Sequence, residues 1–167
     1  NTMLQIRSKT RPDLRSIAAK ELPPHPQIAI NSSISEYEKN DVDFLHLPQK
    51  EAPQHLLSFP FGLSIHHHTD PHHYDEFNPN YYQLGPIFSP ISKKGIPQGI
   101  SLIERTAKET QTPIIAVGGI HPHNINEVLS AGAFGVASSG YLMQAAKPIT
   151  ALETLYSTME KYIQRYE

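Results

Sequence analysis

The chain has 167 residues, a formal net charge of -2 and no cysteine, which suits one domain, residues 1–167, with a core of its own. The balanced charge offers no basic surface for nucleic acid or an anionic membrane, and no apolar run is long enough to cross a bilayer. Without cysteine, disulfides and thiolate chemistry are excluded, and a cytoplasmic enzyme is the class that fits these limits.

Short apolar runs alternate with proline-rich loops from residue 3 to residue 88. Such runs, bounded by Pro, Asn, Ser or Gly, are typical of strands buried on both faces of a parallel sheet. In chain order, the predicted strands are residues 3–7, 27–30, 42–47, 61–65 and 81–88. A helix opening at Pro12 and a helical turn near residues 35–39 are predicted between the first of these strands.

The second half predicts longer helices. Ile100, Ile103 and Ala107 lie on one face of a helix that precedes an apolar run at residues 114–117. The next helix is predicted to open at Pro122 and to stop at Gly132, followed by a strand at residues 134–137. The last helix begins near Pro148. Its apolar residues recur every three or four positions, at Leu152, Leu155, Met159, Tyr162 and Ile163.

Two of the predicted strands, residues 114–117 and 134–137, end in small, glycine-containing turns. The first turn begins with Gly118 and Gly119, and the second contains Ser139 and Gly140. One right-handed crossover would place these turns at the same end of a parallel sheet. Because such turns present free backbone N–H groups, we predict that they form a phosphate cradle.

Strands alternate with helices throughout, which predicts a parallel α/β architecture. Four motifs then occur in a telling order: LQIRSK at 4–9, HLPQ at 46–49, GPIFSPISKK at 85–94 and AVGGIHPHNINEVLSAGAFGVA at 116–137. Together they resemble the thiamine phosphate synthase/TenI superfamily, from Met3 to about Leu142. The resemblance implies a (β/α)8 TIM-type barrel. On this alignment the family's first strand and helix are missing or truncated.

The resemblance also implies a reaction. In the synthases, 4-amino-2-methyl-5-hydroxymethylpyrimidine diphosphate loses pyrophosphate to leave a stabilised cation. The ring nitrogen of 4-methyl-5-(2-phosphoethyl)thiazole captures that cation to give thiamin phosphate. Departure of pyrophosphate needs positive groups and Mg²⁺ at the leaving oxygens and no protein nucleophile. The expected partners are therefore small phosphorylated pyrimidine and thiazole substrates. The oligomeric state stays open, a homo-oligomer included.

The site residues follow from the resemblance, motif by motif. The catalytic cations of the family correspond to Arg7, Lys9 and Lys93 in this chain. Its substrate-binding residues correspond to Gln5, Asn31, Ser64, Ser92, Gly118, Gly119, Ser139 and Gly140. Its second magnesium carboxylate aligns with Glu51.

The sequence departs from the family pattern at functional positions. The first magnesium aspartate is Ser32, and a motif glycine and a phosphate-loop threonine are Pro48 and Pro90. A site with one carboxylate instead of two should hold Mg²⁺ less well. A thiazole tautomerase of the TenI type is therefore an alternative, although the position of its histidine base is Pro86. A barrel that binds a phosphorylated ligand without catalysis is the other alternative.

Histidines gather at His66, His67, His68, His72 and His73, among the 10 histidines of the chain. A zinc site is one interpretation, but zinc ligands usually stand on defined elements with supporting partners. The interpretation we prefer is a polar loop near the active face of the barrel.

Overall fold

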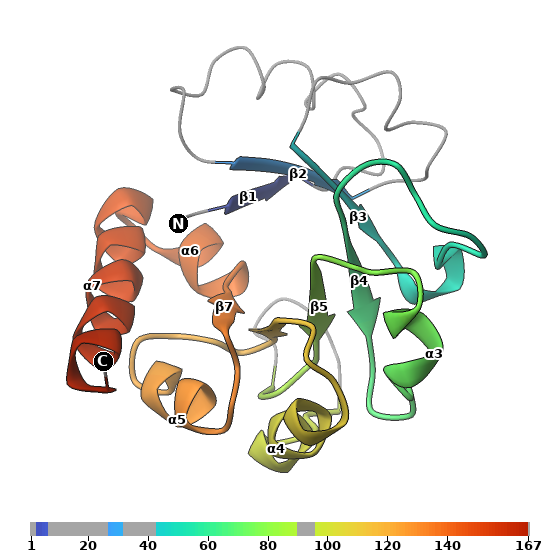
Figure 1. The fold of residues 1–167 in the computed structure, drawn as a ribbon. Coiled ribbons are helices and arrows are strands. Elements are labelled where there is room, and N and C mark those ends of the chain that lie inside the picture. Colours follow the sequence, from blue (N-terminus) through green and yellow to red (C-terminus); the bar gives the residue numbers. More distant parts are fainter. Residues whose placement is uncertain (1–2, 7–26, 32–42, 90–95, 167) are drawn as a thin grey trace. The chain divides into compact units, whose positions relative to one another are not determined.

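The computed structural model describes residues 3–6, 27–31, 43–89 and 96–166 (Figure 1). The chain divides into two compact units, which we describe separately. The first comprises residues 1–64 and 74–81, and the second comprises residues 65–73 and 82–167. The sequence-based prediction of a single domain stays a prediction.

The first unit is built on parallel strands that pair in chain order. These strands are β1 (Met3–Ile6), β2 (Gln27–Asn31), β3 (Phe44–Leu47) and β4 (Phe61–Ile65), whose last residue belongs to the second unit. Their side chains supply the buried core of this unit, with Ala29, Ile30, Leu45, Leu47, Phe61 and Leu63 each at most 2% exposed. Side chains buried on successive positions are what a parallel sheet covered on both faces requires.

Short elements connect these strands. The 3-10 turn η1 (Gln49–Glu51) follows β3, and the backbone N–H of Leu45 donates to Pro60 O just before β4. The helix α3 (His72–Asp75) has residues in both units. It takes up His72 and His73, which the sequence placed in an irregular loop.

The second unit holds parallel strands that also pair in chain order. These are β5 (Tyr81–Leu84), whose first residue belongs to the first unit, β6 (Ile114–Val117) and β7 (Gly135–Ala137). Its helices are α4 (Ile100–Glu109), α5 (Ile125–Ser130), α6 (Gly140–Gln144) and α7 (Pro148–Tyr166). Figure 1 shows α5, α6 and α7, coloured orange to red, near β7.

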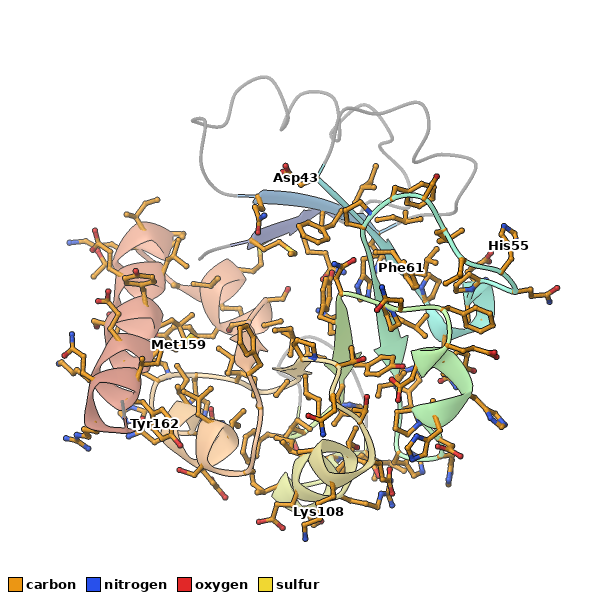
Figure 2. The ribbon with its side chains drawn as sticks, viewed as in Figure 1. Asp43, His55, Phe61, Lys108, Met159 and Tyr162 are labelled. Atoms are coloured by element: carbon orange, nitrogen blue, oxygen red, sulfur yellow. The ribbon has the colours of Figure 1, made fainter. Side chains whose placement is uncertain are left out.

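The helix α7 packs on α5 and α6 through one part of its surface. Ala151 and Leu155 are buried, whereas Ile149, Leu152 and Tyr156 are exposed. Figure 2 shows Met159 and Tyr162 further along the same helix. No helix of the described residues is long and apolar enough to span a membrane.

The described elements confirm most of the predicted ones and correct several boundaries, with β3 beginning at Phe44 and β7 at Gly135. β5 ends at Leu84 rather than at residue 88, and the chain continues beside β6 without being part of the strand. The helix α5 begins at Ile125, so Pro122 lies before the helix and not in its first turn. Gly132 has a φ of 103° and ends α5 in the left-handed conformation, as predicted. The helices predicted near Pro12 and at 35–39 lie outside the described residues.

Candidate functional site

The carboxyl end of β6 lies against the segment that follows β5. The backbone N–H of Ile87 donates to Val117 O at 2.9 Å, and that of Phe88 donates to Gly118 O at 3.0 Å. These bonds extend the contact between the two strands past the end of β5. The segment after β5 and the Gly118–Gly119 turn therefore lie side by side at one end of the strands.

Both glycines of this turn are required by conformation and by space. Their φ angles are 99° at Gly118 and 63° at Gly119, a region that other L-residues rarely occupy. A Cβ at Gly118 would lie 2.6 Å from Pro86 Cβ. A Cβ at Gly119 would lie 2.7 Å from Phe88 Cβ and 2.7 Å from Ser89 O. No residue with a side chain fits the turn without displacing the backbone beside it.

The end of β7 is joined to the same turn. Ser138 Oγ donates to Ile120 O at 2.9 Å, which links the two glycine-containing strand ends directly. Beyond Ser138, the backbone N–H of Met143 donates to Ser139 O at 2.8 Å and closes the first turn of α6. Gly118, Gly119, Ser139 and Gly140 thus come from strand ends that the structure brings together.

Asn124 holds the loop between β6 and α5 in shape. Its Oδ1 accepts from the His121 backbone N–H at 3.0 Å, and its Nδ2 donates to Gly119 O at 2.9 Å. Asn124 is itself 7% exposed, and both bonds are partly buried. The prediction singled out the glycines and missed Asn124. Its side chain makes no capping hydrogen bond to α5, so the usual preference for Asn before a helix does not predict its bonds to Gly119 and His121.

The described segments before and after residues 90–95 both bond close to the glycine turn. After residue 95, Gln98 N–H donates to Pro86 O at 3.0 Å and Gly99 N–H donates to Ile87 O at 2.9 Å. Ser92 and Lys93 themselves lie outside the described residues.

The remaining predicted substrate residues stand on the strands of the first unit. Gln5 lies on β1 opposite Ala29, and Asn31 ends β2 opposite His46. Ser64 lies on β4 and is half-buried. Arg7 and Lys9, the predicted pyrophosphate-binding pair, fall outside the described residues.

The structure adds a residue that the prediction did not include, His46 on β3. Its Nε2 lies 2.8 Å from Ser64 Oγ, and its Nδ1 lies 3.0 Å from Tyr81 Oη. His46 is 0% exposed, so this is a buried polar chain that reaches a predicted substrate residue. The signal in the sequence was the HLPQ motif, which drew attention to Pro48 instead.

Glu51 is the one candidate metal ligand among the described residues. It lies in η1, and its carboxylate pairs with Lys50 Nζ at 3.4 Å. Both side chains are largely exposed, so this ion pair is weak and easily replaced. Protein-bound Mg²⁺ often uses one or two carboxylates together with substrate phosphates. Glu51 could therefore supply one carboxylate to a cation whose other ligands come from elsewhere.

Two histidines of the cluster, His68 and His72, line an open depression in the second unit together with Thr69, Asp70, Arg105 and Glu109. Arg105 Nη2 donates to His67 O at 2.7 Å, and His66 Nδ1 lies 3.0 Å from Gly85 O. Desolvation lowers the pKa of His67, with further lowering from His68, His66 and Arg105. No group of three His, Cys, Asp or Glu side chains in the described ranges could hold a metal ion, which does not favour the zinc interpretation.

Known proteins resemble this chain in sequence and in fold. A family profile described as thiamine monophosphate synthase matches residues 2–142. The thiamine-phosphate synthase of Prochlorococcus marinus is 31% identical in an alignment 173 residues long, which covers 96% of this chain and 50% of that protein. The thiamine-phosphate synthase of Albidiferax ferrireducens is 32% identical over 164 residues, which cover 90% of this chain and 75% of that protein. The chain spans about half the length of several curated relatives it matches.

Among solved structures, the thiamine phosphate pyrophosphorylase from Pyrococcus furiosus superposes with a TM-score of 0.72 at 19% identity, covering 96% of this chain and 82% of that one. A 3-hexulose-6-phosphate synthase superposes with a TM-score of 0.69 at 16% identity, covering 93% and 86%. At such identities the likeness concerns the fold. It shows a parallel α/β fold similar to these TIM-type proteins.

Proposed function

The chain belongs to the thiamine monophosphate synthase family, and on this premise we propose that it couples a pyrimidine diphosphate to a thiazole phosphate with release of pyrophosphate. The family resemblance read from the motifs is thereby confirmed. The substrates proposed are 4-amino-2-methyl-5-hydroxymethylpyrimidine diphosphate and 4-methyl-5-(2-phosphoethyl)thiazole. The product is thiamin phosphate.

One observation carries the proposal, the junction of the glycine-containing ends of β6 and β7. Ser138 Oγ bonds to Ile120 O at 2.9 Å, and Gly118 and Gly119 both have positive φ angles. Successive strand-end amides in such a turn favour an anion. In TIM-type barrels, the loops after the last two strands are the usual phosphate site. We assign the thiazole phosphate to this junction, with Gly118, Gly119, Ser139 and Gly140 around it.

The pyrimidine and its diphosphate are assigned to the other predicted residues. Gln5, Asn31 and Ser64 supply amide and hydroxyl groups to the ring and its substituents. Arg7, Lys9 and Lys93 supply positive charge to the departing pyrophosphate oxygens, and Ser92 lies next to Lys93 in the sequence. Stabilising a leaving group in this way requires well-placed charges and no nucleophile.

Mg²⁺ is part of the proposal, with Glu51 as its protein ligand. A bound Mg²⁺ would neutralise charge on the diphosphate. Since Ser32 replaces a carboxylate of the family pattern, the cation would depend on the substrate for most of its ligands. We therefore expect a weak apparent affinity for Mg²⁺, measured as a high Mg²⁺ concentration at half-maximal rate.

The finer features of the fold are also proposed. They are a (β/α)8 TIM-type barrel and, separately from the fold, a cytoplasmic location. The TIM-like solved neighbours support the barrel.

The direct test supplies both substrates with Mg²⁺ and measures pyrophosphate and thiamin phosphate together. Equal amounts of the two products are expected, and the Lys93→Ala variant should lose them. If neither product forms at saturating Mg²⁺ but calorimetry detects binding of the thiazole phosphate, the chain is a binding protein instead. Metal-independent proton exchange on a thiazole carboxylate phosphate would favour the tautomerase.

A further inference from the structure

A chain of three side chains crosses the first unit from its core to a proposed substrate residue. Tyr81 Oη lies 3.0 Å from His46 Nδ1, and His46 Nε2 lies 2.8 Å from Ser64 Oγ. Tyr81 is 7% exposed and His46 is 0% exposed, while Ser64 is half-buried. Of these three side chains, Ser64 is therefore the one exposed enough to contact a ligand.

Packing holds the imidazole in one place. The rings of His46 and Tyr81 are stacked at 18° with centroids 5.6 Å apart, and Phe44 packs edge-on against Tyr81 at 6.4 Å. Gly62 faces His46 in the pairing of β3 with β4. A Cβ at Gly62 would collide with the Tyr81 ring, so only glycine leaves room for it. Neither ring can turn without opening the core.

The positions of the protons follow from the requirement that buried donors be satisfied. Burial raises the pKa of the Tyr81 phenol, which therefore keeps its proton. In the described part of the chain, His46 Nδ1 is the partner of Tyr81 Oη, so the phenol donates to this nitrogen. A neutral imidazole that accepts at Nδ1 carries its proton on Nε2. The reverse arrangement would leave the buried phenol proton without an acceptor among the described residues, which is unfavourable.

We propose that His46 is a positioning residue for Ser64: the imidazole, held by Tyr81, donates Nε2–H to Ser64 Oγ and leaves the serine proton free to bond to substrate. Ser64 contacts substrate only under the proposed function, so any effect of His46 on kcat/KM rests on that function. The positions of the protons on His46 and Tyr81 do not depend on it. The serine becomes a donor of fixed direction, suited to an acceptor atom such as a pyrimidine ring nitrogen or a diphosphate oxygen.

The proton arrangement is tested by nitrogen NMR of the ¹⁵N-labelled protein, which distinguishes the protonated from the unprotonated ring nitrogen. Comparison with His46→Gln identifies the His46 signals among those of the other histidines. We expect Nε2 to be protonated in the unmodified protein and the tautomer to become mixed in Tyr81→Phe, which keeps the ring over Gly62. A protonated Nδ1 in the unmodified protein overturns the proposal, whether or not the protein makes thiamin phosphate.

The kinetic consequence is tested by a double-mutant cycle on kcat/KM. Ser64→Ala and His46→Gln are each expected to lose about tenfold, the effect of one directed hydrogen bond. If His46 acts through the serine, His46→Gln should cost less than about twofold in the Ser64→Ala background. Losses that multiply in the double variant would show a general structural role for His46 and would overturn its positioning role.

His55→Gln is the matched control for the kinetics. It makes the same chemical change at an exposed histidine, whose side chain points outward in Figure 2. We expect unchanged kcat/KM and an unchanged unfolding midpoint. Should His46→Gln fail to fold, Tyr81→Phe takes its place in the cycle. Its loss in kcat/KM should likewise vanish in the Ser64→Ala background, and a loss that persists counts against the proposal.

Discussion

Replacement of Gly119 by alanine tests the proposed phosphate site most directly. Gly119 has a φ of 63°, and the added Cβ would lie 2.7 Å from both Phe88 Cβ and Ser89 O. An L-residue in the left-handed region costs about 1–2 kcal/mol. Forcing apart a packed contact costs about 1–3 kcal/mol more. Gly119→Ala should therefore lower the free energy of unfolding by about 2–5 kcal/mol.

The consequence for binding follows from where the strain is relieved. The methyl group pushes the segment after β5 away from the turn, so the strand-end amides no longer converge on one phosphate. Loss of one or two hydrogen bonds to a charged group costs about 1.5–3 kcal/mol each. The Kd for 4-methyl-5-(2-phosphoethyl)thiazole, measured by calorimetry, should rise by at least about tenfold.

Gly132→Ala is the control, because Gly132 combines the same two features at another place. Its φ is 103°, and a Cβ there would lie 2.9 Å from Ala107 Cβ. Gly132 precedes β7, whereas the proposed site follows that strand. Both variants should be destabilised in urea unfolding, but only Gly119→Ala should bind thiazole phosphate more weakly. Equal affinity in the two variants would refute the placement of the phosphate.

Three further predictions concern charge, packing and pH. Lys93→Ala should reduce kcat by at least about a hundredfold because its charge no longer stabilises the departing pyrophosphate. Lys108→Ala, a change at the exposed lysine of α4 in Figure 2, should leave kcat unchanged. Leu155→Ala should lower the free energy of unfolding by about 3 kcal/mol because Leu155 is 5% exposed. Leu152→Ala, at a position that is 41% exposed, should cost less than about 1 kcal/mol in the same urea titration. Burial raises the pKa of Tyr81, so its stabilising contribution is complete below the ordinary tyrosine pKa and is lost as pH rises above it. Unfolding measured above about pH 10 should show a steeper loss of stability in the unmodified protein than in Tyr81→Phe.

Local sequence was enough to predict the strands and the turns that end them. The apolar run at β6 is bounded by Pro113 and Gly118, and these residues permit few alternatives to a short buried strand. Gly132 likewise ends α5 because only a residue without a Cβ adopts its φ of 103° at no cost. Where boundaries were wrong, tertiary contacts decided them. Asn124 bonds to Gly119 O and sets the loop before α5, so the helix starts after Pro122.

The sequence by itself determined the family, the parallel α/β class and the small residues at the strand ends, because each depends on residue types at fixed local spacing. Only the tertiary structure decided that Ser138 bonds to the loop after β6 and that His46 stands between Tyr81 and Ser64. These partners are 18 to 35 residues apart along the chain. The register of parallel strands brings them within bonding distance, and no pattern of neighbouring residues encodes that register.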